Sequence, residues 1–214
     1  MAKQRAFLKK DAQSRRSFGE RHHLEQRLRQ QGYQRIVGVD EAGRGALAGP
    51  VVAAAVVLPH GCEIDGLDDS KQLTPIQREK LFEAIHGVAL AIGVGAVNNQ
   101  EIDRINILQA TLEAMRQAVQ QISPLPDYVL VDGTHLPHIP IAATAIPKGD
   151  SLIPAIAAAS IIAKVTRDAT MTVCDEHYPH YGFQKHKGYG TIAHRQAISQ
   201  LGPCPIHRRS FKLC

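Results

Sequence analysis

Four acidic side chains occupy positions where the chain is expected to leave a strand or to turn. Asp40 and Glu41 directly follow a β-branched run at residues 36–39. Asp132 ends a second apolar run, and Asp150 lies in the turn before a long helical pattern. Strand ends that neighbour each other in a sheet place their side chains close together, so these carboxylates could share one pocket. Like charges at such distances repel unless divalent cations lie among them, and oxygen ligands favour Mg²⁺ or Mn²⁺ over zinc.

Asp40 and Glu41 are neighbours in the chain, which restricts how they can act together. Successive residues of a regular strand point to opposite faces, so the pair can reach one ion only if the strand is interrupted there. Gly43 and Gly45 offer a place for the interruption. A surface turn with solvated acids explains this stretch equally well by itself. A dinucleotide-binding fingerprint is excluded, because Gly49 comes one position late and a proline and a valine run follow where a helix should begin.

A cluster of carboxylates that holds two divalent ions suits phosphodiester hydrolysis. Two ions about 4 Å apart can activate a water on one side of the phosphorus and stabilise the leaving oxygen on the other. A carboxylate pair could instead serve as acid and base in glycoside hydrolysis. The chain has no Trp and an aromatic content of 5%, so few rings are available to stack on sugars, which makes a glycosidase less attractive.

Two glycine-rich pieces could read a nucleic-acid substrate. Gly43-Arg44-Gly45 offers bare backbone and one guanidinium, which can approach a 2′-hydroxyl and the adjoining phosphate, the feature that separates RNA from DNA. Residues 185–190 offer cations and the ring of Tyr189, which can stack on a sugar or base. Each piece alone is more typical of a turn or a surface loop. His186 and His194, like the more distant His207, could carry protons, although a structural or solvated histidine is the simpler interpretation.

Charge is distributed unevenly along the 214 residues. Lys and Arg outnumber Asp and Glu by 10 to 3 in residues 1–35 and by 6 to 0 in residues 177–214, whereas residues 36–176 have 9 against 17. Basic arms around an acidic middle suit a metal-dependent enzyme that acts on a polyanion, although basic termini can also serve solubility alone. No apolar run is long enough to cross a membrane, and the four scattered Cys favour reduced thiols and a cytoplasmic location.

Periodicity predicts a mixture of strands and helices. The expected strands are residues 36–39 and 51–58, joined as a hairpin, and residues 89–97, 127–132 and 141–146. The expected helices are residues 74–85, 101–122, 154–176 and 191–201, with a short N-terminal helix capped at Ser17 and ending before Gly32. Residues 179–190 are expected to form a loop. This order predicts an α/β fold with helices around a mixed sheet.

Eight segments, taken in order, resemble bacterial ribonuclease HII. They are VDEAGRGALAGPVV, DSKQL, NILQATLEAM, VDG, KGDS, AAASIIAKVTRD, HKGYGT and HRRSF. The similarity covers roughly residues 35–211. It implies a ribonuclease H-like fold whose C-terminal helical segment closes over the substrate. It also implies an endonuclease that cuts the RNA strand of RNA–DNA hybrids and single ribonucleotides embedded in duplex DNA, leaving 5′-phosphate and 3′-hydroxyl ends.

The resemblance also implies residue roles. Asp40, Glu41 and Asp132 match the metal-binding acids of the family, which would hold Mn²⁺ or Mg²⁺, and Asp150 matches its fourth catalytic acid. Two ions are expected when substrate is bound.

The residues implied for substrate binding lie in four segments. Gly43-Arg44-Gly45 matches the motif that reads the 2′-hydroxyl at the RNA–DNA junction, and Tyr189 matches the tyrosine that stacks on the following deoxyribose. Ser70 and Lys71 match a phosphate-contacting pair. Leu152 stands where family members often have a basic residue, so one phosphate contact is expected to be missing.

The organisation expected from the sequence is a basic N-terminal extension, residues 1–34, partly helical or disordered, followed by a catalytic domain, residues 35–214. We expect a monomer without an obligate protein partner, whose substrate is an RNA–DNA hybrid or a DNA duplex that contains ribonucleotides. Two alternatives are a DNA resolvase-like nuclease on the same fold and a non-catalytic nucleic-acid-binding domain. Uncompensated acids would repel phosphate, which argues against the latter.

Overall fold

The structure is a computed structural model that describes residues 23–67 and 73–213. Its strands are β1 (Ile36–Ala42), β2 (Val51–Val57), β3 (Ala91–Val97), β4 (Tyr128–Asp132) and β5 (Ala142–Ile146). Its helices are α2 (His23–Gln30), α3 (Pro75–Val88), α4 (Asn99–Gln120), α5 (Pro154–His177), α6 (Phe183–His186) and α7 (Ile192–Leu201), with a 3₁₀ turn, η1, at Gly149–Ser151. All five predicted strands are confirmed.

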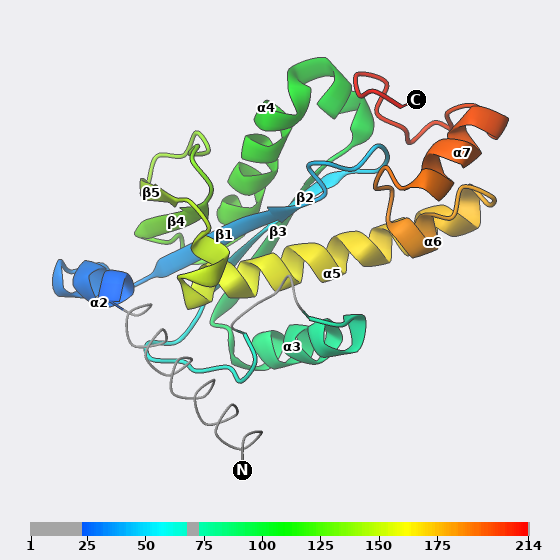
Figure 1. Cartoon of the computed structure of the whole chain (residues 1–214). Coiled ribbons are helices and arrows are strands. Elements are labelled where there is room, and N and C mark those ends of the chain that lie inside the picture. Colours follow the sequence, from blue (N-terminus) through cyan, green and yellow to red (C-terminus); the bar gives the residue numbers. More distant parts are fainter. Residues whose placement is uncertain (1–22, 68–72, 214) are drawn as a thin grey trace, which may run out of the picture.

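The strands form one mixed sheet in the order β3-β2-β1-β4-β5 (Figure 1). β1, β2 and β3 pair antiparallel along the meander, and β4 and β5 continue the sheet in parallel with β1. The predicted hairpin and mixed sheet are therefore confirmed. The parallel pairing of β1 with β4 brings their carboxyl ends, and the acids there, to the same edge of the sheet.

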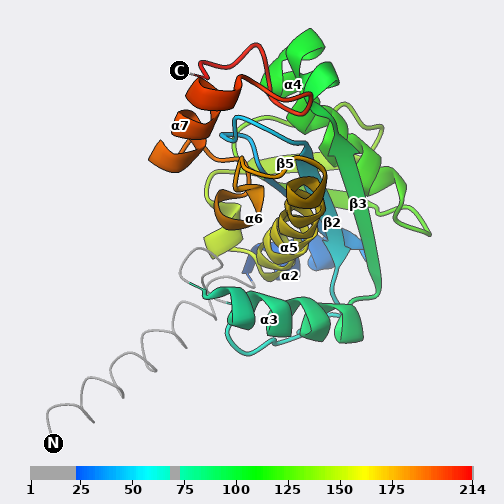
Figure 2. The same cartoon turned by 90° about the vertical axis from the view of Figure 1, so that its right-hand side faces the viewer.

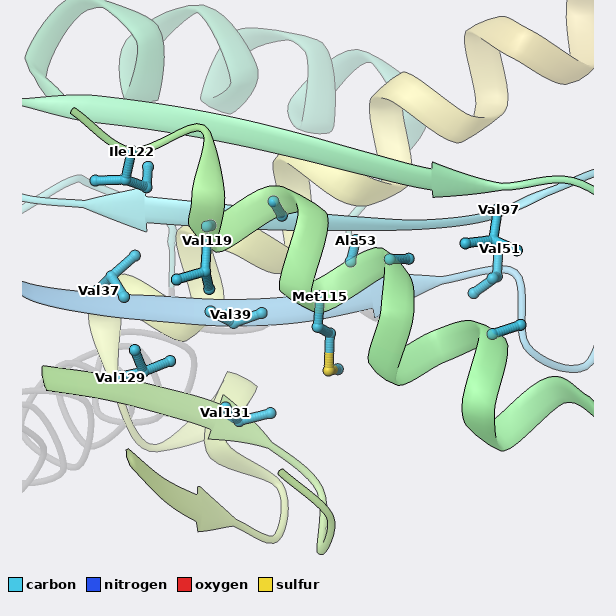
Figure 3. Packing of buried hydrophobic residues seen from close by; sticks show 14 of the residues in the cluster. Val37, Val39, Val51, Ala53, Val97, Met115, Val119, Ile122, Val129 and Val131 are labelled. Carbon is cyan, nitrogen blue, oxygen red and sulfur yellow. The ribbon is translucent and has the colours of Figure 1, made fainter. Parts of the chain in front are cut away.

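Helices cover both faces of the sheet. On one face, α4 packs Met115 and Val119 against buried valines such as Val39 and Val131 (Figure 3). On the other face lies α5, with α3 outside it (Figure 2). Gly38 lets α5 approach β1 closely, because a Cβ at this position would overlap the main chain of Ala155. The N-terminal part of α5 is thus held directly against the central strand.

The N-terminal part of the described chain joins the same core. Leu28 of α2 is buried against Ile36 and Leu130, and Leu24 packs beside it. The predicted cap at Ser17 lies outside the described residues, whereas the helix does end before Gly32 as expected. None of the described helices is both long and apolar enough to cross a membrane.

Three helical details differ from the sequence prediction. The stripe expected to run unbroken from residue 101 to 122 is interrupted at Asn106, whose φ of 68° and ψ of 164° are not helical. The side chain of Asn106 accepts a hydrogen bond from the amide of Gln109 and so caps the second part of α4. The loop expected at residues 179–190 contains the short helix α6, and α3 continues to Val88 rather than residue 85.

The C-terminal segment completes the turn between β1 and β2. Ala46 forms an isolated bridge with Tyr189, and Ala48 forms one with His207. The amide of Arg208 donates to the carbonyl of Leu47 at 2.8 Å. These main-chain contacts hold residues from the end of the chain against the predicted substrate-reading turn.

Candidate active site

The pairing between the two central parallel strands ends where the acids lie. The pairing of β1 with β4 extends to Val39 and Val131, whereas β1 remains paired with β2 through Ala42. Asp40 and Asp132 are the next residues of the two strands, and β4 ends at Asp132. The acids thus lie at the carboxyl ends of paired central strands.

The expected interruption of the strand at Asp40 and Glu41 is wrong. β1 runs through both residues to Ala42, and their partners on β2 are Ala54 and Ala53. Asp40 lies on the α5 side, since it receives a hydrogen bond from Ser160, and Glu41 contacts Arg44 at 3.4 Å. Both side chains nevertheless line one cavity. The two side chains thus share this space without a break in β1.

Asp132 and Asp150 enter the same cavity from the other side. Oδ1 of Asp132 accepts a hydrogen bond of 2.6 Å from the amide of Gly149, which fixes η1 against the end of β4. Asp150, in η1, is buried. The cavity has a volume of about 490 Å³ and is lined by Asp40, Glu41, Ala42, Gly43, Arg44, Gly45, Arg78, Asp132, Asp150, Ser160, Lys164 and Tyr189. The structure therefore brings together the four acids, the Gly-Arg-Gly segment and the tyrosine.

The electrostatics of the cavity favour a bound cation. Burial raises the pKa of Asp40 well above its ordinary range, and the neighbouring charges of Glu41 and Asp132 raise it further. Burial also raises the pKa of Glu41, which Arg44 opposes and Asp132 reinforces. A divalent cation would relieve this repulsion and stabilise the ionised carboxylates.

The donor set fits Mg²⁺ or Mn²⁺, because it consists of carboxylate oxygens. Within residues 23–67 and 73–213, no three acidic, His or Cys groups converge closely enough to form a ready-made metal site. The acids line the cavity without closing on one point. Such an open arrangement suits Mg²⁺, which keeps several waters and is usually held by one or two carboxylates together with substrate phosphates.

The two glycines of the Gly-Arg-Gly segment differ in what surrounds them. Gly43 has a φ of +95°, and a Cβ there would overlap Nε of Arg167, so the fold itself requires glycine. At Gly45 a Cβ would meet no atom within 4 Å, and its φ is outside the left-handed region. Gly45 lines the cavity, so the absence of a side chain at this position leaves room for a ligand that enters the cavity.

Tyr189 also lines the cavity. Its half-buried ring lies near two cations, with Nζ of Lys164 5.7 Å and Cζ of Arg167 5.2 Å from the ring centroid. Cations beside one part of an aromatic ring hold its position by cation–π attraction. The predicted pair Ser70 and Lys71 lies outside the described residues.

Three polar residues that line the cavity were not predicted from the sequence. Ser160 and Lys164 come from α5, and Arg78 comes from α3. The sequence did contain a signal for Ser160 and Lys164. Together with Asp168 they recur every four residues along an otherwise Ala/Ile-rich helix, so they lie on one face of it. Arg78 carries no comparable signal, since exposed arginines are common on helices.

The three histidines of the C-terminal region are structural in their contacts and do not line this cavity. Nδ1 of His194 lies 3.0 Å from the carbonyl of Tyr189, and its Nε2 lies 3.0 Å from Nε2 of His207. Because a carbonyl only accepts, His194 carries its proton on Nδ1 and accepts from His207 on Nε2. His186 contacts the carbonyl of Tyr181 at 2.8 Å. Burial lowers the pKa of His194 to about 4, which keeps the pair neutral.

Comparisons with known proteins identify the family of the chain. The family model for ribonuclease HII matches residues 37–214. Ribonuclease HII of Geobacter sulfurreducens is 59% identical over 189 residues, which are 88% of this chain and 87% of that protein. Ribonuclease HII of Syntrophotalea carbinolica is 54% identical and covers 89% and 91% of the two chains.

Two solved structures have similar folds. The ribonuclease H2 of Pyrococcus horikoshii OT3 superposes with a TM-score of 0.70 at 30% identity, over 84% of this chain and 95% of that one. A structure of the PCNA:RNase HII complex from Archaeoglobus fulgidus matches with a TM-score of 0.70 at 26% identity, over 84% and 96%. With the mixed sheet and the acids on its central strands, these matches show that the chain belongs to the ribonuclease HII family, metal-dependent endoribonucleases that cleave the RNA of RNA–DNA hybrids and cut at ribonucleotides in DNA.

Proposed function

We propose that the 490 Å³ cavity is the catalytic centre, with Asp40, Glu41 and Asp132 as metal-binding acids and Asp150 as the fourth catalytic acid. The observation that carries the proposal is that four carboxylates from three separate segments line one cavity beside a Gly-Arg-Gly turn. Two Mn²⁺ or Mg²⁺ ions held there would supply an activated water and neutralise the leaving oxygen, giving 5′-phosphate and 3′-hydroxyl ends.

The residues of the chain have distinct tasks in this proposal. Ser160 donates to Asp40 and favours its ionised form, the form that binds a cation. The amide of Gly149 orients Asp132. The exposed guanidinium of Arg44, whose side chain is 49% exposed, is available to a phosphate while it contacts Glu41.

In this proposal the Gly-Arg-Gly turn and Tyr189 recognise the ribose. The backbone of Gly43-Arg44-Gly45 borders the cavity, and Gly45 leaves space for a 2′-hydroxyl to approach it. Tyr189 faces the cavity and can stack on the next sugar. Ser70 and Lys71 remain proposed phosphate contacts.

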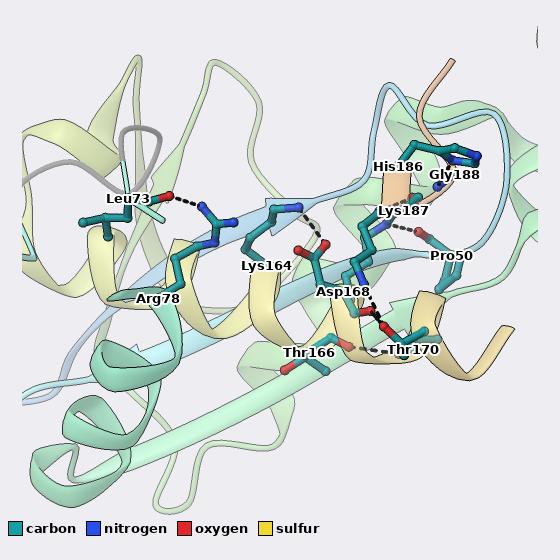
Figure 4. A network of polar contacts seen from close by, with 12 residues as sticks. Pro50, Leu73, Arg78, Lys164, Thr166, Asp168, Thr170, His186, Lys187 and Gly188 are labelled. Atoms are coloured by element: carbon teal, nitrogen blue, oxygen red, sulfur yellow. Dashed lines mark hydrogen bonds and ion pairs between the residues drawn. The ribbon is translucent and has the colours of Figure 1, made fainter. Parts of the chain in front are cut away.

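A second cavity, of about 620 Å³, extends the site toward α6. It shares Arg78, Lys164 and Tyr189 with the catalytic cavity and adds Lys185 and Lys187 to its lining. Figure 4 shows Lys164 beside Asp168, at 2.6 Å, and Arg78 donating to the carbonyl of Leu73. We propose that this cation-rich groove follows the sugar–phosphate backbone of the duplex.

All of the residues in the proposed site come from one chain, so we propose that the protein acts as a monomer without an obligate partner. The related Archaeoglobus fulgidus protein was solved with PCNA, so gel filtration with and without a sliding clamp would test this part. We also propose a cytoplasmic protein whose catalytic domain spans residues 35–214 behind a basic extension. The three described Cys, all unpaired, suit that location.

The central test is cleavage of a DNA duplex that contains one ribonucleotide, with and without added Mn²⁺ or Mg²⁺. We expect metal-dependent cutting on the 5′ side of the ribonucleotide and no cutting of the all-DNA duplex. Asp132→Asn should abolish cleavage, whereas Glu83→Gln, which changes an exposed acid on α3, should not. Equal cutting of both duplexes, or full activity of Asp132→Asn, would refute the proposal.

A further inference from the structure

Two arginines lie completely buried behind the Gly-Arg-Gly turn, outside the lining of either cavity. Arg167, from α5, uses its whole guanidinium to donate to main-chain carbonyls. Its Nε donates to Pro50 at 2.9 Å, its Nη1 to Lys187 at 3.0 Å and its Nη2 to Ala48 at 3.1 Å. One side chain thus joins the turn after β1 to the loop that carries Tyr189.

Arg208 comes from the C-terminal segment and repeats this arrangement. Its Nε donates to the carbonyl of Gly49 at 3.0 Å, its Nη1 to that of Arg44 at 2.9 Å and its Nη2 to that of Pro50 at 3.0 Å. The two guanidiniums share the carbonyl of Pro50 as an acceptor. Together they hold the main chain of residues 44–50 from beneath.

Neither arginine has a carboxylate partner within ion-pair distance among the residues that the structure describes. Burial lowers the pKa of both guanidiniums, and the charge of Arg167 lowers that of Arg208 further. Apolar side chains of similar volume would generally fill such a space at lower cost in folding free energy. Both arginines donate only to main-chain carbonyls, and the charges of Asp168 and Asp103 act on them from beyond ion-pair distance. Two buried cations held in this way indicate a role other than packing.

Both arginines contact the residues proposed to read the ribose. Arg167 packs so closely against Gly43 that no Cβ fits there, and it lies 5.2 Å from the ring centroid of Tyr189. Arg208 binds the carbonyl of Arg44, the middle residue of the reading segment. The ring of Phe211 lies 5.1 Å from the guanidinium of Arg208 and limits its movement.

We propose that Arg167 and Arg208 are positioning residues for ribose recognition: they fix the carbonyls of residues 44–50 and keep two positive charges behind the cavity. This inference rests on the proposed function of the Gly-Arg-Gly turn and Tyr189. Five charge-assisted hydrogen bonds fix the turn before substrate arrives, and a sixth fixes Lys187 in the loop that carries Tyr189, so less ordering is required on binding. Their charges attract the phosphate next to the ribose without occupying the cavity.

The test replaces each arginine by lysine, which lacks the planar fork and can donate to fewer of these carbonyls in the same geometry. For Arg208→Lys and Arg167→Lys we expect the KM for the single-ribonucleotide duplex to rise about tenfold while kcat stays within about twofold, because binding geometry is lost and the acids are untouched. Selectivity, the ratio of the inhibition constant of an all-DNA duplex to that KM, should fall by about the same factor. Arg209→Lys makes the same change at an adjacent exposed site and should alter neither quantity.

The outcomes separate this inference from the function on which it rests. Failure of the wild-type chain to cut the ribonucleotide duplex would refute the proposed function itself. With an active wild type, unchanged KM and selectivity in both lysine variants would overturn the positioning role. Urea unfolding must accompany the kinetics: if both lysine variants are unfolded at the assay temperature, the pair serves fold stability alone and the proposal is also overturned.

Discussion

Gly43 and Gly45 should respond in opposite ways to the same substitution by alanine. At Gly43 the residue must adopt a φ of +95°, and its Cβ would overlap Nε of Arg167. The left-handed conformation costs a non-glycine residue about 1–2 kcal/mol, and forcing a methyl group into a packed site adds about 1–3 kcal/mol. We therefore expect Gly43→Ala to lower the free energy of unfolding by about 2–5 kcal/mol.

Gly45→Ala causes neither backbone strain nor a steric overlap, since the φ of Gly45 is outside the left-handed region and no atom lies within 4 Å of the new Cβ. Alanine lowers the conformational entropy of the unfolded chain. The free energy of unfolding should therefore stay unchanged or rise by about 0.4–1 kcal/mol. Its methyl group would enter the cavity where the ribose is proposed to lie. A displaced substrate commonly reacts about 100-fold more slowly, so we expect a loss of kcat/KM of that order with a fully folded enzyme.

Thermal unfolding and single-ribonucleotide cleavage, measured on both variants, make the contrast quantitative. For a domain of this size, about 2–4 °C of Tm corresponds to 1 kcal/mol. Gly43→Ala should then melt about 4–20 °C below the wild type, and Gly45→Ala at or up to about 4 °C above it. Equal Tm values for the two variants, or wild-type cleavage by Gly45→Ala, would refute the distinction between a structural and a substrate-facing glycine.

Three further predictions concern charge. Asp132→Asn keeps the acceptor for Gly149 but removes a charge that raises the pKa of Asp40, so its metal-free Tm should rise while added Mn²⁺ stabilises it less than the wild type; a lower metal-free Tm would contradict this. Because the pKa of His194 is lowered to about 4, the unfolded chain binds its proton first as pH falls. His194 should therefore lend stability at neutral pH that is lost between about pH 6.5 and 4, by about 2 kcal/mol once solvent screening is allowed for. Urea midpoints compared with His194→Gln isolate this contribution, and a constant difference across that range would exclude it. Deletion of residues 1–22, which hold seven Lys/Arg against two Asp/Glu, leaves α2 in place and should make the salt dependence of hybrid binding shallower by at least about one in log–log slope; an unchanged slope would show that the segment does not touch phosphate.

Local patterns of apolar residues predicted most of the helices and strands, and they also predicted that the acids lie close together. Each strand carries its own apolar run, and Asp40 and Asp132 each follow one, so a parallel pairing was enough to bring them together. The continuation of β1 through Asp40 and Glu41 could not be predicted, because it depends on pairing with β2 and not on the sequence of β1 alone. An interruption of the strand was therefore expected where the structure has a continuous strand.

The rest of the site depends on contacts between distant residues. Arg208 and the carbonyl of Arg44 are 164 positions apart, and no periodicity connects them. The short helix α6 has too few residues to show a helical pattern. The break at Asn106 is a local event in an otherwise continuous apolar stripe, which periodicity averages over.

The same separation of 164 positions bears on how the protein becomes active during translation. The segment proposed to sense ribose leaves the ribosome well before the residue whose guanidinium lies beneath it, which is made 164 positions later. At synthesis rates of about 5–20 residues per second, roughly 8 to 33 seconds pass between the two. A nascent chain would therefore expose its acids well before its ribose sensor is complete, so discrimination between RNA and DNA should be acquired only after Arg208 has been made.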